Sequence, residues 1–316
     1  AVRHNSPMGE PQAGKGAVDW EEPLHLGSPG VTGTGCGNQL AATADLVIGV
    51  GTRFQDFTTG SWTVFSNPSR KILSINIHGY DAEKRGAQAL VSDAKVALEK
   101  ISAALGDTRF ADPDLAARDA WFATTGGLTA QPAGNELPTA AQVIGAVQRN
   151  TGKNSIVMSA AGTMPGALHV LWRAAAGGYH MEYGFSCMGY EIAGAMGIKM
   201  ARPDADVVCM VGDGSYMMAN SELATAVMMG LPFTVVLTDN RGYGCINRLQ
   251  KGTGGAAFNN MLDDSYHVNP AAIDFESHAR SMGAIVVKAG SIAQLETEMQ
   301  AAKTAKLPTV IVIDTD

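Results

Sequence analysis

The sequence predicts an α/β protein made of two doubly wound parallel-sheet domains. Three observations lead to this prediction. Short, continuous apolar runs alternate with helical patterns along the chain, as in strands that are buried on both faces. The length of 316 residues suits two domains of ordinary size. A Gly-Asp-Gly triplet, residues 212–214, directly follows one apolar run, and such strand ends are where these sheets bind ligands.

Residues 1–108 are expected to form the first domain. Its strands are the runs DLVIGVG and KILSINIH, and a helix capped by Asp93 should follow them. The chain opens in what looks like an element already under way, so we expect this domain to be incomplete at its N-terminal side. Residues 109–137 are rich in Ala, Asp, Pro, Gly and Thr and are predicted to be a linker.

Residues 138–316 are expected to form the second domain, with the larger sheet. A helix capped by Thr139 opens it. Five apolar runs separated by helical patterns follow: NSIVMSA, DVVCMVGD, FTVVLTDN, AIVVKAG and PTVIVIDTD. Because parallel strands end at the same edge of a sheet, the loops after the second and third runs should lie side by side.

Those two loops carry the candidate ligand site. Asp213 follows the second run and Asn240 follows the third. A carboxylate, a side-chain amide and a nearby backbone carbonyl form a hard oxygen set that suits Mg²⁺ or Ca²⁺ and not zinc. The backbone amides of Gly214 and Ser215 could receive phosphates that share the metal. The pattern therefore indicates a metal-bridged diphosphate, although a lone Gly-Asp-Gly triplet is more often a plain turn.

The composition and the other glycine-rich segments argue against several classes of protein. A net charge of −7 argues against a nucleic-acid-binding surface, and no apolar run approaches the ~20 residues of a membrane span. The segments QAGKGAV and VTGTGCG lack the spacings of P-loop and dinucleotide-binding motifs. The four cysteines have no metal-binding spacing, so we interpret them as reduced thiols of a cytoplasmic protein.

The spacing of the site resembles the signature motif of the thiamine-diphosphate enzymes. Asp213 and Asn240 are 27 residues apart (240 − 213 = 27), and Gly242 stands two residues further on. The resemblance implies thiamine diphosphate and Mg²⁺ as cofactors, with Asp213, Asn240 and the carbonyl of Gly242 as metal ligands. Asp239 stands where the family usually has asparagine, a departure that leaves the ligand position itself intact.

Further segments are similar to parts of the same family. In FSCMGYEIAGAMG, Met188 occupies the place of the apolar residue that bends the cofactor, and the carbonyl of Ser186 would meet its aminopyrimidine. On its own, Met188 would more simply be a core residue. Gly162 and Thr163 resemble the loop that contacts the diphosphate, and Tyr243 would cover it. The first domain resembles the family's Rossmann-like central domain, which holds FAD in some relatives; no matching FAD signature is present here.

Four segments narrow the resemblance to one subfamily: QAGKGAV, QDFTTGSW, MEYGFSCMGYEIAGA and GYGCINRLQ. They are similar to the ring-opening hydrolases of inositol catabolism, which cleave a carbon–carbon bond of 3D-(3,5/4)-trihydroxycyclohexane-1,2-dione to give 5-deoxyglucuronate. The resemblance implies a homodimer or homotetramer with the active site at the interface. The family's activating glutamate lies on a separate pyrimidine-binding domain. We therefore expect a fragment that is inactive alone, and we assign it no catalytic residue.

Two other functions stay open. One is an acetolactate-synthase-like carboligase or a 2-oxoacid decarboxylase with the same cofactor, and the other is a non-catalytic nucleotide-binding module. Substrate contacts are also open, and the residues considered for them are His169, His180, Glu182, Tyr183, Arg241, Asn247 and Arg248, with Glu222 more simply a solvated or capping carboxylate.

Overall fold

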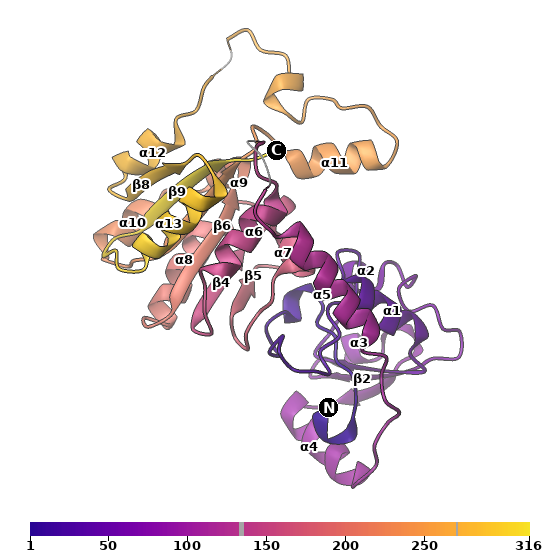
Figure 1. The fold of residues 1–316 in the computed structure, drawn as a ribbon. Coiled ribbons are helices and arrows are strands. Elements are labelled where there is room, and N and C mark those ends of the chain that lie inside the picture. The colour runs from indigo at the N-terminus through magenta and orange to yellow at the C-terminus, as the bar shows by residue number, and fades with distance from the viewer. Residues whose placement is uncertain (133–135, 270) are drawn as a thin grey trace. The chain divides into compact units, whose positions relative to one another are not determined.

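The computed structural model describes residues 1–132, 136–269 and 271–316 of the chain. It divides into two compact units, Ala1–Thr124 and Thr125–Asp316, each an α/β unit with its own parallel sheet (Figure 1). This confirms the predicted fold class. Within the described ranges, no helix is both long enough and apolar enough to cross a bilayer.

The first unit holds a three-stranded parallel sheet in the order β1-β2-β3. Its strands are β1 (Leu46–Val50), β2 (Lys71–Asn76) and β3 (Gln88–Val91). Its helices are α1 (Gly35–Thr43), α2 (Asp56–Thr59), α3 (Gly79–Ala82) and α4 (Ala94–Leu105), with short 3₁₀ helices at Val2–His4, Gln12–Gly14 and Lys84–Gly86. Asp93 caps α4 as predicted, because its carboxylate accepts a hydrogen bond from the amide of Val96 at 3.0 Å.

The predicted linker, residues 109–137, contains a helix that the sequence analysis did not expect. This helix, α5, spans Ala116–Leu128, and the boundary between the two units falls inside it. Its sequence, AARDAWFATTGGL, is rich in alanine, the strongest helix former, and this outweighs the Thr and Gly residues that suggested a linker. Residues 133–135 of the predicted linker lie outside the described residues.

The second unit is built on a six-stranded, all-parallel sheet in the order β5-β4-β6-β7-β9-β8. Its strands are β4 (Ser155–Ser159), β5 (Tyr179–Met181), β6 (Asp206–Gly212), β7 (Thr234–Asp239), β8 (Ile285–Ala289) and β9 (Thr309–Asp314). The chain runs outward from β4 to β5 and then returns past β4 to β6. The strand order therefore reverses between β4 and β6, and ligands bind such sheets at the carboxyl ends of the strands beside that reversal.

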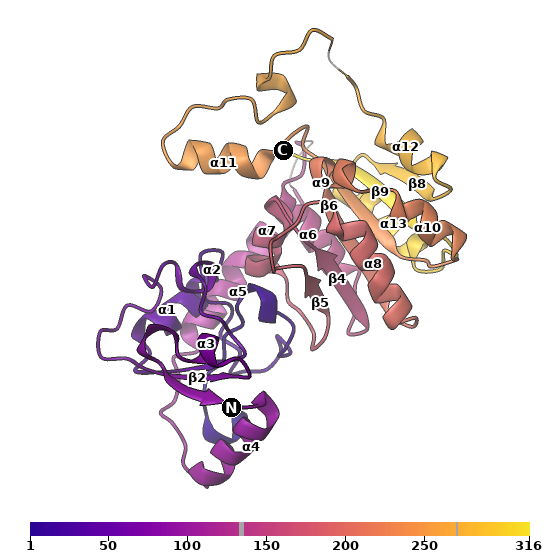
Figure 2. The same ribbon diagram turned by 180° about the vertical axis from the view of Figure 1, so that it is seen from behind.

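Helices cover both faces of this sheet (Figure 2). One face packs against α6 (Ala140–Arg149), α7 (Thr163–Leu171) and α13 (Ile292–Ala302). The other packs against α8 (Tyr190–Ala201), α10 (Glu222–Met228) and α12 (Phe275–Ser281). The remaining helices are α9 (Asp213–Met218), α11 (Gly244–Gly252) and a 3₁₀ turn at Leu262–Asp264.

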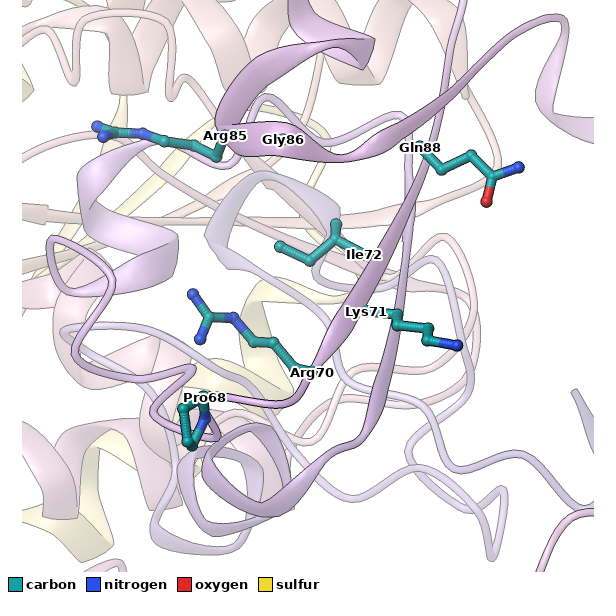
Figure 3. Close-up of a pocket in the computed structure, with 7 residues that line it drawn as sticks. All are labelled: Pro68, Arg70, Lys71, Ile72, Arg85, Gly86 and Gln88. Carbon is teal, nitrogen blue, oxygen red and sulfur yellow. The ribbon is translucent and has the colours of Figure 1, made fainter.

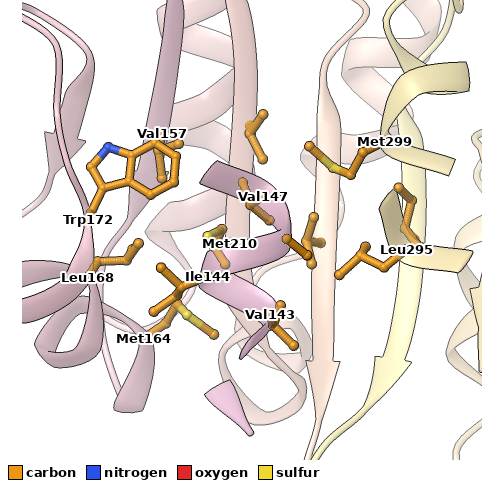
Figure 4. Packing of buried hydrophobic residues seen from close by; sticks show 14 of the residues in the cluster. Val143, Ile144, Val147, Val157, Met164, Leu168, Trp172, Met210, Leu295 and Met299 are labelled. Atoms are coloured by element: carbon orange, nitrogen blue, oxygen red, sulfur yellow. The ribbon is translucent and has the colours of Figure 1, made fainter. Parts of the chain in front are cut away.

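The central strands are mostly apolar, as expected for strands that are buried on both faces. Along β6, Val208 and Met210 belong to the cluster under α6, α7 and α13, which Figure 4 shows. Val207 and Cys209 belong to the cluster on the opposite face. The helix predicted from Thr139 begins there with a reciprocal capping box, in which Thr139 and Gln142 exchange backbone and side-chain hydrogen bonds. These two clusters fix the strand ends that carry the candidate site.

Candidate functional site

The loops after β6 and β7 meet at the carboxyl edge of the six-stranded sheet. Gly212 pairs with Thr238 across the two strands, so the residues that follow leave the sheet side by side. The amide of Gly242 donates a hydrogen bond to Oδ2 of the buried Asp213 at 2.9 Å. The structure thus brings together the two loops that the sequence analysis assigned to one site.

Gly242 is held in place by a second contact. It forms an antiparallel bridge with Met261, and the amide of Tyr243 donates to the carbonyl of Asn260 at 2.7 Å. Gly242 has a φ of 153°, and a Cβ there would lie 2.6 Å from the carbonyl oxygen of Asn260. Only glycine fits this close approach, so the backbone beside Asp213 is fixed by the return of the chain at residues 260–262.

The side chain of Asn240 has one feature that fits the predicted metal site. Its side-chain oxygen Oδ1 is buried and has no hydrogen-bond partner. A buried polar atom without a partner costs on the order of 1–3 kcal/mol, and such atoms often mark a place where an ion or ligand binds. The Asp213 carboxylate, this oxygen and the backbone of Gly242 together fit a hard cation such as Mg²⁺. Among the described residues, no group of three or more His, Cys, Asp or Glu gathers in a metal-binding arrangement.

Without a cation, the ionised form of the Asp213 carboxyl is disfavoured by its surroundings. The pKa of Asp213 is raised to about 6, chiefly by burial and also by the nearby Asp239 carboxylate, while the amides of Gly214 and Gly242 oppose the shift. A bound cation would favour the ionised form of the carboxyl and reverse this shift.

Met188 and Tyr243 converge on the Gly-Asp-Gly turn. A Cβ added to Gly214 would lie 2.8 Å from Cε1 of Tyr243 and 3.6 Å from Cε of Met188. Met188 is 37% exposed and belongs to neither hydrophobic cluster of this unit, so it is not a core residue. A side chain of any size at position 214 would fill the space that these two side chains border.

The other predicted contacts lie at the same edge. Gly162, with a φ of 89°, and Thr163 follow β4 at the start of α7. Arg248 of α11 donates a hydrogen bond to Oγ1 of Thr163. Ser186 has a φ of 55°, and its hydroxyl donates to the carbonyl of Ala160 at 3.0 Å. The predicted cofactor residues from four separate segments therefore gather at one edge; their contacts with a cofactor stay predictions.

One residue of this edge, Glu191, was not predicted from the sequence. Glu191, in the first turn of α8, is 1% exposed and accepts a hydrogen bond from the Ser215 hydroxyl at 2.7 Å. It also accepts bonds from the amides of Gly189 at 3.0 Å and Ala161 at 3.3 Å. Burial raises the pKa of Glu191, and the Ser215 hydrogen bond opposes that rise. A glutamate inside the apolar run YEIAGAMG was the available signal.

Several residues whose roles were open have structural partners. His180 Nε2 lies 3.1 Å from the Tyr190 hydroxyl. Glu182 accepts hydrogen bonds from the amides of Cys187 at 2.8 Å and Phe185 at 3.1 Å, which lower its pKa and shape the loop before Met188. Arg241 pairs with Asp263 at the surface.

A cavity in the first unit is a weaker candidate. It has a volume of about 380 Å³ and is lined by Arg70, Lys71 and Arg85 among others (Figure 3). It lies at the amino ends of β2 and β3, the edge opposite to the one at which parallel sheets bind ligands. The guanidinium carbons of Arg70 and Arg85 lie 5.6 and 5.8 Å from the centroid of the Trp62 ring. These charges are therefore engaged in cation–π contacts within the unit.

Comparison with known protein families gives two matches, and both are domains of thiamine pyrophosphate enzymes. Residues 1–101 match the family described as thiamine pyrophosphate enzyme, central domain. Residues 160–313 match the family described as thiamine pyrophosphate enzyme, C-terminal TPP binding domain.

Curated relatives give a consistent result. Proteins named 3D-(3,5/4)-trihydroxycyclohexane-1,2-dione hydrolase are 39% identical in Geobacillus thermodenitrificans and 36% identical in Clostridium perfringens, over 98% of this chain in both cases. One of the same name in Bacillus anthracis is 38% identical over 96% of the chain. The matched regions cover 53%, 54% and 53% of these relatives. The chain thus spans about half the length of the curated relatives it matches.

Proposed function

Since this chain belongs to the thiamine pyrophosphate enzyme family, with both its central and its cofactor-binding domain, we propose that its second unit holds the diphosphate of thiamine diphosphate through Mg²⁺. The observation that carries this proposal is the side-chain oxygen Oδ1 of Asn240, which is buried and has no hydrogen-bond partner. Asn240 lies two residues before Gly242, whose amide contacts Asp213. The Asp213 carboxylate, Oδ1 of Asn240 and the carbonyl of Gly242 would be the protein ligands of the metal. Mg²⁺ commonly completes its shell with cofactor phosphates and water.

The remaining residues of the edge would bind and orient the cofactor. The amides of Gly214 and Ser215 and the loop at Gly162 and Thr163 would receive the diphosphate. Met188 and Tyr243, which border the space above Gly214, would pack against the cofactor and exclude water from it. The carbonyl of Ser186 would accept a hydrogen bond from its aminopyrimidine. When bound, thiamine diphosphate supplies the electron sink for cleavage of a carbon–carbon bond next to a carbonyl.

For the whole protein we propose the hydrolytic ring opening of trihydroxycyclohexane-1,2-dione to 5-deoxyglucuronate in inositol degradation. The support is the name shared by the curated relatives, which match nearly the whole chain. We also propose that the protein acts in the cytoplasm as a homodimer or homotetramer with the active site at the interface. No catalytic acid or base is assigned to the two units described here.

The test is turnover by the full-length protein. Loss of the ultraviolet absorbance of the dione is measured with and without thiamine diphosphate and Mg²⁺. We expect turnover that requires both. Consumption of pyruvate in place of the dione would favour the carboligase or decarboxylase alternative. Failure to bind thiamine diphosphate in the presence of Mg²⁺ would reject the cofactor proposal and favour a non-catalytic nucleotide-binding module.

A further inference from the structure

Three separate segments of the second unit meet at one buried carboxylate. Glu191 accepts hydrogen bonds from Ala161, which follows β4, from Gly189, which follows Met188, and from Ser215, which follows Asp213 by two residues. The amide of Gly189 also lies 2.9 Å from the Ser215 hydroxyl oxygen. Glu191, Gly189 and Ser215 therefore form a closed ring of hydrogen bonds.

The ring is a strong link because its acceptor is a buried acid. Burying a carboxylate is unfavourable unless donors replace the water it loses, and bonds to a charged acceptor are stronger than bonds between neutral groups. Removing any one donor leaves the buried group short of a partner. A second contact supports the ring, because a Cβ on Gly189 would lie 3.0 Å from Cβ of Ala219 at the end of α9. The segment after Met188 thus packs directly on α9.

We propose that Glu191 is a positioning residue that fixes the Met188 segment against the Ser215 turn. It thereby sets the distance between the side chain proposed to bend the cofactor and the backbone proposed to hold its diphosphate. This inference rests on the proposed function. It also assigns the Ser215 hydroxyl to Glu191, so that position 215 contacts a diphosphate through its backbone amide.

The opposite end of the same two strands offers a matched control. Ser155 is buried, and its hydroxyl donates to Oδ2 of Asp206 at 2.9 Å. Ser155 and Asp206 are the first residues of β4 and β6, so this serine–carboxylate bond lies at the amino edge of the sheet. Ser155→Ala removes the same kind of bond as Ser215→Ala but lies away from the candidate site.

Two variants remove the link in different ways. Glu191→Gln keeps the shape of the side chain, but one of its oxygens becomes an NH₂ group. If the NH₂ takes the place of Oε2, it faces the amide of Gly189, which is a donor. If it takes the place of Oε1, it faces the hydroxyl of Ser215 and the amide of Ala161, which also donate there. Ser215→Ala removes the hydroxyl and leaves the glutamate in place. If both act through one link, the double variant should be scarcely weaker than either single variant.

The experiment measures two quantities in the full-length protein. Hydrogen exchange of the Gly189 amide is measured without cofactor. The Kd of thiamine diphosphate is measured with Mg²⁺ by titration calorimetry, together with the near-ultraviolet circular dichroism of the bound cofactor. We expect Glu191→Gln and Ser215→Ala to speed the exchange and to raise the Kd roughly 10-fold, the effect of one lost charge-assisted hydrogen bond. The dichroism should change, and Ser155→Ala should leave all three readouts unchanged.

The possible outcomes separate this inference from the proposed function. If both variants behave like Ser155→Ala in exchange, Kd and dichroism, the positioning role is wrong even though the protein binds its cofactor. A loss of thermal stability alone, equal in Ser155→Ala and Ser215→Ala, would also overturn it. If the wild-type protein does not bind thiamine diphosphate with Mg²⁺, the proposed function fails, and the role of Glu191 towards the cofactor fails with it.

Discussion

The two edges of the six-stranded sheet use similar side chains in different ways. At the amino edge, Ser155 donates to Asp206 and Asn154 donates to the carbonyl of Asp204, so these groups partner one another at the strand starts. At the carboxyl edge, Asp213 is buried with a raised pKa, and the side-chain oxygen of Asn240 has no partner. The asparagine and aspartate side chains at the amino edge thus have hydrogen-bond partners, whereas at the carboxyl edge the oxygen of Asn240 has none. The difference teaches that a polar side chain without a partner is the pattern expected at the edge where we propose that a ligand binds.

The largest expected effect comes from the Asp213 carboxylate at the carboxyl edge of the sheet. Asp213→Ala should weaken Mg²⁺-dependent binding of thiamine diphosphate by more than about 100-fold, because it removes the one carboxylate of the proposed metal site. Titration calorimetry measures this, and Asp206→Asn at the amino edge is the control, with an expected change below about twofold. If Asp213→Ala bound thiamine diphosphate with a Kd within threefold of the wild-type value, the proposed difference between the carboxyl and amino edges would be wrong.

The next effect separates binding from stability. Asn240→Leu should weaken cofactor binding by about 10- to 100-fold, since it removes a proposed metal ligand. The same change replaces a buried, unpartnered oxygen with an apolar group. Without cofactor, the free energy of unfolding should therefore stay constant or rise by about 1 kcal/mol. Chemical denaturation checks this second part, and a loss of several kcal/mol would show that the Asn240 side chain has a structural role instead.

A pH series sharpens the same contrast. Because the pKa of Asp213 is raised to about 6, protons compete with Mg²⁺ below that pH, and binding should weaken by up to about tenfold per pH unit. A carboxyl with a raised folded-state pKa lowers stability as pH rises from about 4 to about 6 in the protein without metal. Asp213→Asn should reduce that decline by an amount on the order of 1 kcal/mol, and Glu191, whose pKa is also raised, keeps its own contribution. Denaturation at several pH values, with chelator present, tests this; an unchanged decline in the variant would contradict it.

The smallest effect is expected at Ser155, at the amino edge of the sheet. Ser155→Ala should lower the free energy of unfolding by about 1 kcal/mol, because Asp206 loses one hydrogen-bond donor in a partly solvated position. Cofactor binding should not change. Calorimetric unfolding and binding titrations measure the two parts. A Kd that rises as much as in Ser215→Ala would mean that the two edges are coupled through β4 and β6.

Much of the fold could be predicted because the central strands are apolar on both faces. The runs that became β4, β6, β7 and β9 stand out for that reason, and the run of β8 stands out by its β-branched residues although β8 lies at the sheet edge. The short strands β3 (QALV) and β5 (YHM) do not, because they lie at sheet edges and contain polar residues. After Gly212 the chain forms two short helices, α9 and α10, which are separated near Asn220, where the Asn220 side chain donates a hydrogen bond to the Tyr216 carbonyl.

The candidate site was predictable to the extent that strand order determines it. Asp213 and Gly242 meet because β6 and β7 are neighbours. The contacts of Glu191 were not predictable, because its partners Ser215 and Ala161 are 24 and 30 residues away in the sequence, one in α9 and the other after β4. In the sequence alone, an acid in the first turn of a helix already has a local explanation in the helix dipole.

The bridge between Gly242 and Met261 has a consequence for how this protein can diversify. The amide of Leu262 also donates a hydrogen bond to the carbonyl of Arg241. These two contacts join the ends of the segment 242–261, an excursion of the chain that contains α11. A loop fastened at both ends tolerates insertions and exchanged residues at a small entropic cost. Exposed positions of this excursion, such as Ile246, Leu249 and Phe258, can therefore accumulate changes while Asp213, Asn240 and Gly242 keep their arrangement. The excursion can thus evolve separately from the neighbouring loops, whose backbone arrangement the closure at its base preserves.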